Sequence, residues 1–294
     1  MTAAVVRPLR RSLPSPPRLA RIVIVAVLVG VAVSHVRWMF LDWSLHDMNV
    51  YWDAAMRLRT GAPLYAATDP LDVYRYAPWW AYAWVPLTYL PKIVVDVGWS
   101  LLLLIASGLA TALLLRRATL AAGLAALLFA PLLFAISSIG NVQPLLVLVL
   151  AWGIPRRSGP VWIALAASLK AVPLAFVLIY VARREWLRAA TAVVLTALLV
   201  SPMLLFPIPL EVFSAGRAAH LPTPLWATLA LLAVGAAVLL ALRRSGWTPL
   251  AAAVAAVAAL PRLFLYEVAL VEVGTLLSDP RREVERGDRS RDSA

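Results

Sequence analysis

The sequence of 294 residues contains no cysteine, so the fold uses neither a disulfide nor a thiolate metal site. Charged residues are also scarce, at 14% of the chain, whereas a soluble domain has about a quarter. Hydrophobic residues make up 62% of the sequence, and the mean hydropathy is +0.83. A soluble core cannot bury this much apolar surface, so the composition indicates a protein with many membrane spans.

Metal-binding patterns are missing as well. The three histidines, His35, His46 and His220, are isolated and form no ligand pattern. No Asp-x-Asp pair occurs, so a metal-dependent sugar-nucleotide site is not indicated, although carboxylates alone could hold a divalent ion transiently. We therefore expect no metal and no other cofactor.

Acidic residues are outnumbered, with 15 against 27 basic residues and a net charge of +12. In a soluble protein this excess would suggest a nucleic-acid partner. Here the basic residues are clustered between apolar runs, which is typical of topology signals and of contacts with lipid headgroups. We expect the lipid bilayer as a partner and no nucleic acid.

The apolar runs predict the fold class. A membrane-spanning helix needs about 20 apolar residues. The segment 160–182 is interrupted by Lys170 and Pro173, which predicts two short helices that go out and come back. The other candidate spans are residues 22–40, 93–115, 118–139, 141–155, 187–206, 225–242, 247–260 and 263–278. We expect an all-α polytopic membrane protein of about ten helices, some short or broken around a cavity.

The arginine clusters decide the expected orientation, because cytoplasmic loops are enriched in arginine and lysine. They are Arg7, Arg10, Arg11, Arg18 and Arg21, then Arg116 with Arg117, Arg156 with Arg157, Arg183 and Arg184 with Arg188, and Arg243 with Arg244. If all face the cytoplasm, both termini are cytoplasmic. The N-terminus resembles a signal peptide, but no cleavage site is clear, so we expect a retained anchor. The chain then divides into a disordered basic tail (1–21), a transmembrane domain (22–278) and a charged cytoplasmic tail (279–294).

One loop collects the first six acidic residues of the chain. They are Asp42, Asp47, Asp53, Asp69, Asp72 and Asp96, in or just beyond residues 41–92. This segment joins the first two predicted spans and is therefore expected to be extracytoplasmic. Loops this long are usually functional.

A helix is predicted inside this loop. Ser44 and Asp47 have the Ser-x-x-Asp form that begins helices, and Gly61 followed by Pro63 marks the expected end. At helical spacing, one face carries Asp47, Val50, Tyr51, Ala54, Ala55 and Leu58, and the opposite face carries Asn49, Asp53, Arg57 and Thr60.

The two acids of this helix admit different interpretations. Asp53 can pair with Arg57 at i, i+4. Asp47 either stabilises the helix start through the macrodipole or faces a cavity at membrane level. A carboxylate in such a cavity is costly unless it has a function.

An aromatic segment follows in "VYRYAPWWAYAWVPLTYLP", residues 73–91. Tyrosine and tryptophan favour the headgroup level of a membrane, so an interfacial belt is one interpretation. Aromatic faces also bind the apolar faces of sugar rings, and a groove of this kind beside a carboxylate suits carbohydrate.

The order of these motifs resembles glycosyltransferase family 87, which consists of polyprenol-phosphate-mannose-dependent α-mannosyltransferases with a GT-C-type membrane fold. The similarity starts with "DMNVYWDAAMRLRTGAPLY … YRYAPWWAYAWVPLTYLP" and continues with "SSIGNVQPLL", "SLKAVPLAF", "ARREWLRA" and "LPRLFLYEVALV". It covers roughly residues 20–275. The family tends to carry Gly-Gln-x-Asn where this chain has Asn141 and Gln143 in the reverse order.

The resemblance implies a mechanism and a set of site residues. A β-linked polyprenyl-phosphate sugar in the outer leaflet would donate its sugar, with inversion, to a hydroxyl of a glycolipid or glycan acceptor. The sugar is expected to be mannose, with arabinose and glucose as alternatives. Asp47 takes the position of the general base. The expected substrate-binding residues are Tyr51, Asp53, Tyr65, Arg75, Tyr76, Asn141, Gln143, Lys170, Arg262 and Tyr266.

Several of these residues also have simpler interpretations. Asp53 is a reserve candidate for the base. Lys170 either contacts the lipid phosphate or extends to the interface, and Arg262 has the same two interpretations. Glu267, which follows Tyr266, can simply pair with Arg262. Arg75 can be an ordinary arginine of a surface loop.

Two other classes of protein fit the same composition. A transporter or lipid flippase would also have broken helices and intramembrane charges. A relative that binds polyprenyl lipids without catalysis is the second alternative. The acid-rich loop and the absence of an internal repeat favour the glycosyltransferase.

Overall fold

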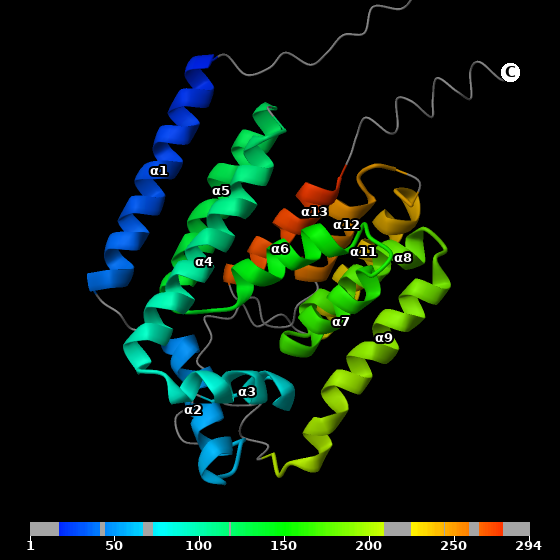
Figure 1. Ribbon diagram of the computed structural model, residues 1–294. Coiled ribbons are helices and arrows are strands. Elements are labelled where there is room, and N and C mark those ends of the chain that lie inside the picture. Colours follow the sequence, from blue (N-terminus) through cyan, green and yellow to red (C-terminus); the bar gives the residue numbers. More distant parts are fainter. Residues whose placement is uncertain are drawn as a thin grey trace, which may run out of the picture.

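We describe a computed structural model of the chain, which covers residues 18–41, 45–66, 73–117, 119–208, 225–243, 245–258 and 265–278. Within these ranges every regular element is a helix, as the sequence predicts (Figure 1). The elements are α1 (Arg18–Leu41), α2 (His46–Thr60), α3 (Pro78–Trp84), η1 (Val85–Tyr89), α4 (Lys92–Leu115), α5 (Leu120–Ser138), α6 (Gln143–Gly153), α7 (Gly159–Leu169), η2 (Val172–Phe176), α8 (Val177–Ala182), α9 (Trp186–Val200), η3 (Ser201–Leu205), α11 (Leu225–Ala241), α12 (Thr248–Ala258), η4 (Leu265–Leu270) and α13 (Val271–Leu277).

Four stretches among the described residues are long and apolar enough to cross a membrane. They are Ala20–Arg37, Lys92–Leu115, Leu120–Ser138 and Trp186–Leu205. The helices α6, α7 and α12 are apolar but have 11 residues each, which corresponds to about 17 Å and is shorter than the hydrocarbon layer of about 30 Å. The membrane character is thus confirmed, and the larger count of about ten spans stays a prediction.

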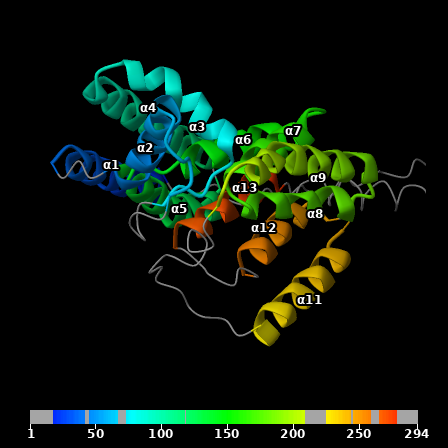
Figure 2. The same cartoon turned by 90° about the horizontal axis from the view of Figure 1, so that it is seen from below.

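The helices form two groups side by side (Figures 1 and 2). In the first group, α1 and α4 both pack against α5. Ile24 and Leu28 of α1 are buried there with Phe129 and Ala130 of α5. Gly123 permits this approach, because a Cβ atom at that position would lie 2.8 Å from the Ile24 side chain. In the second group, α6, α7, α8, α9, α12 and α13 surround a core to which α6 contributes Leu146, Val147 and Leu150.

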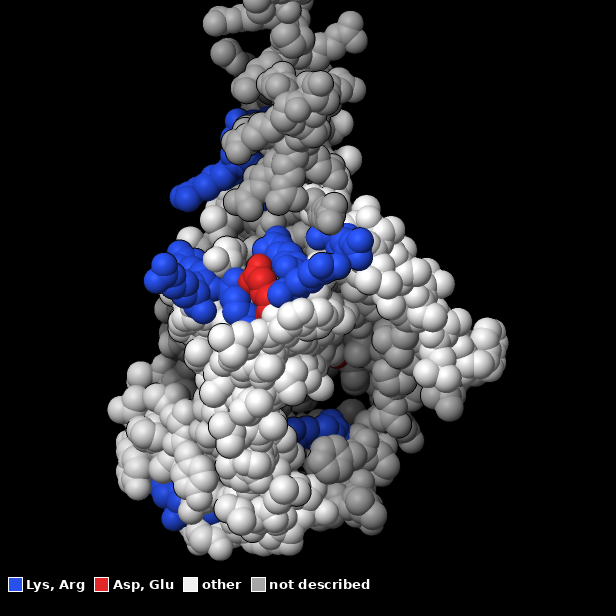
Figure 3. Space-filling model, turned by 90° about the vertical axis from the view of Figure 1, so that its right-hand side faces the viewer, with Lys and Arg blue, Asp and Glu red and all other residues white. Residues whose placement is uncertain are grey.

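The two ends of the molecule differ in charge. The helices α2 and α3 pack on each other at one end, and α4 runs from there for 24 residues, about 36 Å, to the opposite end (Figure 1). Lysine and arginine side chains gather in a band toward that opposite end, and the face below this band is hollowed (Figure 3). The ends of α4 and α8 that carry Arg116, Arg117 and Arg183 thus lie away from α2, whereas Arg75 and Lys92 lie near α2.

The expected break at Lys170 is present. Helix α7 ends at Leu169, and Lys170 itself has an extended backbone with φ −141° and ψ 131°. Pro173 then lies in the short helix η2, which continues into α8. From this break the Lys170 ammonium reaches Asn141, in the turn between α5 and α6.

Ser44, the predicted capping residue of α2, lies outside the described residues. The N-cap of α2 is Leu45, in a left-handed conformation with φ 31° and ψ 40°, and its own side chain makes no capping hydrogen bond. The Asp47 N–H donates instead to the Ile139 carbonyl of a distant turn, at 2.9 Å. The predicted end is confirmed, since α2 stops at Thr60 and Gly61 has φ 73°. Tertiary contacts therefore set the start of α2, and local sequence sets its end.

The two predicted tails lie almost wholly outside the described residues. Helix α1 begins at Arg18, before residue 22, where the sequence predicted the first span to start. Asp42, Asp69 and Asp72 of the acidic loop also lie outside the described residues.

Candidate active site

The first turn of α2 is held against the turn between α5 and α6. Besides the bond from Asp47 to Ile139, Trp99 of α4 donates its indole N–H to the Gly140 carbonyl at 2.8 Å. Gly140 has φ 78°, and a Cβ atom there would lie 2.7 Å from the Cβ atom of Met48. Only glycine fits this approach without strain, so it places the start of α2 directly beside the residue that follows, Asn141.

Asn141 links the two charged residues of the site. Its side chain is 1% exposed. The amide nitrogen donates to the Asp47 carboxylate. The amide oxygen accepts from the Lys170 ammonium at 3.0 Å and from the Gln143 backbone N–H at 2.9 Å. A carboxylate, an amide and an ammonium therefore form one hydrogen-bonded row, and the Lys170 and Gln143 donors fix which way the amide faces.

Burial and charge act in opposite directions on Asp47. Burial raises the pKa of the Asp47 carboxyl above its usual value, because the charged form loses water. The Lys170 ammonium, the Asn141 hydrogen bond, His46 and Arg75 act to lower the pKa, and burial outweighs them. Asp47 is only partly buried, so part of it stays accessible to a ligand.

An aromatic cluster forms one side of the site. Tyr51, Trp80, Trp84 and Trp99 pack around one another with ring centroids 4.9 to 6.2 Å apart. All six of these contacts are edge-on or tilted, and aromatic rings favour such arrangements over a face-to-face stack. The Tyr51 and Tyr76 hydroxyls lie 3.0 Å apart, and the Val142 N–H donates to the Tyr51 hydroxyl at 3.4 Å. The cluster therefore touches the turn that carries Asn141.

The structure brings several predicted site residues together and separates others. Asp47, Asn141 and Lys170 are joined directly, and Tyr51 and Tyr76 lie next to them. Tyr65 is 2% exposed, and its hydroxyl donates to the Tyr76 carbonyl at 2.8 Å. Tyr65 therefore supports Tyr76 from behind.

Gln143, Arg75 and Asp53 occupy three different settings. Gln143 is fully buried, and neither polar atom of its side-chain amide has a hydrogen-bond partner among the described residues. Arg75 is exposed and acts on Asp47 electrostatically. Asp53 is exposed on the outer face of α2, away from the buried face, and is not part of the row.

Two predicted site residues cannot be placed. Arg262 and the side chain of Tyr266 lie outside the described residues. Glu267 is buried, and its charge acts on Lys170.

Sequence reasoning missed Gly140 and Trp99. The signal for Gly140 was the Gly-Asn pair directly after an apolar helix, which marks a turn with a left-handed residue. No local signal pointed to Trp99, because its partner lies 41 positions away in the sequence.

Comparison with known proteins gave one match. Residues 74–215 match the sequence model of glycosyltransferase family 87. The matched segment is just under half of the chain, and it contains Asn141, Gln143 and Lys170 but not Asp47. No curated protein and no solved structure matched. The match and the apolar helices together support a membrane-bound glycosyltransferase.

Proposed function

We propose that this chain is a member of glycosyltransferase family 87 that transfers a hexose, in the first place mannose, from a polyprenyl-phosphate donor to a hydroxyl of a lipid or glycan. The observation that carries the proposal is the hydrogen-bonded row of Asp47, Asn141 and Lys170. It places a proton acceptor and a cation on either side of one amide, in a chain whose middle segment matches this family.

The row supplies the two groups that the transfer needs. The acceptor hydroxyl oxygen forms a bond to the anomeric carbon, and the bond from that carbon to the phosphate oxygen breaks, so the configuration inverts. The hydroxyl proton passes to the Asp47 carboxylate, which acts as general base. The polyprenyl phosphate leaves as an anion, whose charge the Lys170 ammonium stabilises. General base catalysis contributes about 10²–10⁴-fold, and stabilisation of developing charge contributes a comparable or larger factor.

Asn141 has a positioning role in this proposal. Its amide oxygen already accepts two hydrogen bonds, and its nitrogen donates to Asp47, which leaves little capacity for a ligand. It holds the base and the cation at a fixed separation. Gln143 remains a candidate for the substrate side, because both polar atoms of its buried amide are unsatisfied within the structure.

The proposed orientation places α2 and the site on the extracytoplasmic side and both termini in the cytoplasm. The supporting observation is that the arginine-bearing ends of α4 and α8 lie at the end opposite α2 (Figures 1 and 3). Donor and acceptor lipids would then reach Asp47 from the outer leaflet.

The decisive experiment tests the assigned base. Membranes that contain the protein are given radiolabelled polyprenol-phosphate mannose and a lipid extract, and mannosylated products are measured. We expect Asp47→Asn to reduce product formation by about 10²–10⁴-fold. The matched control is Asp53→Asn, which alters an exposed acid on the same helix and should keep near-normal activity.

The outcomes of this experiment distinguish the assigned base from other residues, and a transferase from a flippase. Full activity of Asp47→Asn would reject the base. Absence of product from the unaltered protein, together with movement of the labelled lipid between leaflets, would favour a flippase over a transferase.

A further inference from the structure

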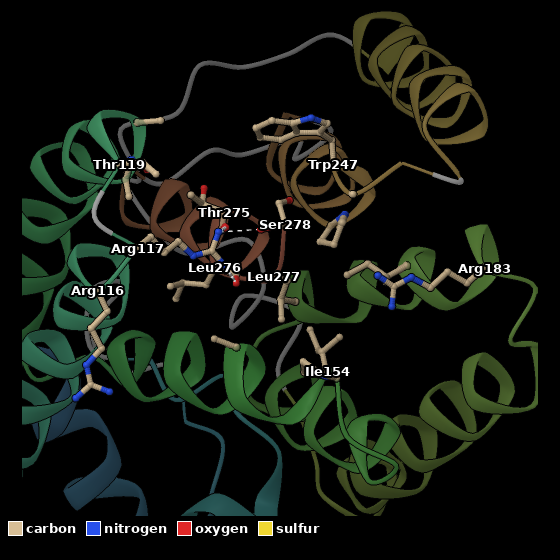
Figure 4. Close-up of a pocket in the computed structure, with 17 residues that line it drawn as sticks. Arg116, Arg117, Thr119, Ile154, Arg183, Trp247, Thr275, Leu276, Leu277 and Ser278 are labelled. Carbon is tan, nitrogen blue, oxygen red and sulfur yellow. Dashed lines mark hydrogen bonds between the residues drawn. The ribbon is translucent and has the colours of Figure 1, made fainter. Parts of the chain in front are cut away.

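A cavity of about 760 Å³ lies at the end of the molecule opposite α2 (Figure 4). Its walls come from the connection between α4 and α5, the end of α6, helix α8, the start of α12 and the end of α13. Its volume is within the range of roughly 300–1,000 Å³ that is typical of small-molecule sites. The cavity is separate from Asp47, because the length of α4 lies between them.

The charged residues that line this cavity are all positive. They are Arg116, Arg117 and Arg183, and the described lining contains no acidic residue. Glu185, which follows shortly after Arg183, is paired with Arg188 at 2.6 Å. The described lining therefore carries positive side chains and no acidic one, which favours an anion.

Arg117 joins the two chain segments that form one wall of the cavity. Its guanidinium donates to the carbonyls of Thr275 and Ser278 at 2.9 and 2.8 Å, and also to Leu276. These bonds satisfy the last carbonyls of α13 and fasten them to the end of α4. Arg116 and Arg183 are exposed and lie on either side of this fastened helix end (Figure 4).

The remaining lining is partly apolar. Ala121, Ala122 and Ala151 contribute methyl groups, and Trp247 contributes a half-exposed indole ring. Tryptophan favours the boundary between the headgroups and the hydrocarbon. The lining therefore suits a ligand that joins a charged head to an apolar body, and the volume exceeds that of a phosphate ion.

We propose that this cavity binds the headgroup of an anionic phospholipid from the leaflet on the arginine-rich side. Guanidinium groups bind phosphate oxygens through paired, charge-assisted hydrogen bonds. Basic pockets between helices at the cytoplasmic side of a membrane commonly hold such headgroups. The proposal concerns a second site, and it holds whichever sugar, or none, is transferred at Asp47.

The test measures thermal unfolding of the full chain in detergent while lipid is added. Phosphatidylglycerol should raise the melting temperature in a saturable way, because a ligand that binds only the folded state stabilises it. Phosphatidylcholine and inorganic phosphate should have little effect. In Arg116→Gln with Arg183→Gln, the phosphatidylglycerol concentration needed for half the effect should rise by about tenfold or more.

A charge-matched control distinguishes a site from general attraction. Arg157→Gln with Arg243→Gln removes the same charge from exposed arginines at the same end that do not line the cavity. This control should respond to phosphatidylglycerol as the unaltered chain does. Equal weakening in both double variants would overturn the proposal, as would equal stabilisation by phosphatidylcholine. If inorganic phosphate raised the melting temperature as much as phosphatidylglycerol does, the cavity would bind a free anion, and the proposal of a lipid ligand would be overturned.

A second measurement uses the unaltered chain and does not depend on how the variants fold. Vesicles are prepared with phosphatidylglycerol that carries a photoreactive headgroup, and the cross-linked peptides are identified. We expect cross-links to residues 116–122, 246–249 or 275–278. Cross-links that are confined to other segments, or that are equally frequent with a zwitterionic analogue, would contradict the site.

Discussion

Asn141 connects the two charged residues of the candidate active site, although an amide takes no part in proton transfer itself. Because its bond to Asp47 orients the carboxylate, Asn141→Ala should lower the turnover rate on the order of 10²-fold, as a displaced catalytic group does. The same bond lowers the pKa of Asp47, so its loss should also move the acid limb of the pH profile to higher pH.

The control for Asn141 is Ser138→Ala, a buried neighbour that bonds the Ala135 carbonyl within its own helix. The positioning role is tested by measuring kcat and kcat/KM against pH for both variants. If the Asn141→Ala protein were less stable but kept the normal pH profile, the role of Asn141 would be merely structural.

Lys170 gives a prediction for pH dependence. A base must be deprotonated, and burial raises the pKa of Asp47, so activity should fall as the pH drops through a value above that of an ordinary aspartate. The Lys170 ammonium opposes this rise. Lys170→Met should therefore raise the pKa of Asp47 further and shift the acid limb to higher pH.

The matched variant is Lys92→Met, since Lys92 pairs with Asp96 at 2.9 Å on α4 and does not contact the row. Lys92→Met should leave the acid limb of the pH profile of kcat/KM at its normal pH. A shift of the limb to lower pH in Lys170→Met would contradict the assignment of Asp47 as the titrating base.

At the scale of elements, the turn between α5 and α6 positions the site, and Gly140 permits that turn. Gly140→Ala would place a Cβ atom 2.7 Å from the Met48 Cβ atom in a left-handed backbone. We expect a loss of about 1–3 kcal/mol in the free energy of unfolding and a loss of activity, because α2 must move away from Asn141. Thermal unfolding and the transfer assay measure both effects.

Gly98→Ala is the comparison for this element. Gly98 lies inside α4, and a Cβ atom there would meet nothing within 4 Å. This change should be neutral or stabilise the helix by up to about 1 kcal/mol, since alanine favours helix more than glycine does. If Gly140→Ala and Gly98→Ala lowered the free energy of unfolding equally, the close approach of Gly140 to Met48 would have no special role in stability.

Local rules predicted some elements well and failed at others for a physical reason. The end of α2 at Gly61 and the break at Lys170 follow from glycine, proline and charge within a few residues. The start of α2 does not, because it depends on Ile139, a residue far along the chain. The pairing of Asp47 with Asn141 could not be predicted either, since 94 positions separate them and no local pattern records the contact.

At the scale of the whole molecule, the prediction concerns topology. The chain contains no cysteine, so single cysteines can be introduced and labelled without background. Asp53→Cys, exposed on α2, should react with a membrane-impermeant maleimide on intact cells. Arg157→Cys, exposed at the arginine-rich end, should react only after the membrane is opened. The reverse pattern would place the site in the cytoplasm and exclude an outer-leaflet donor.

The row of Asp47, Asn141 and Lys170 also has a consequence for biogenesis. A ribosome adds about 5–20 residues per second, so roughly 10 s pass between synthesis of the aspartate and synthesis of its lysine counter-charge. During that interval the ammonium that balances the carboxylate does not yet exist. Water is the cheaper environment for the uncompensated carboxylate during that interval, so the site can be completed only after the segment that carries Lys170 has been made.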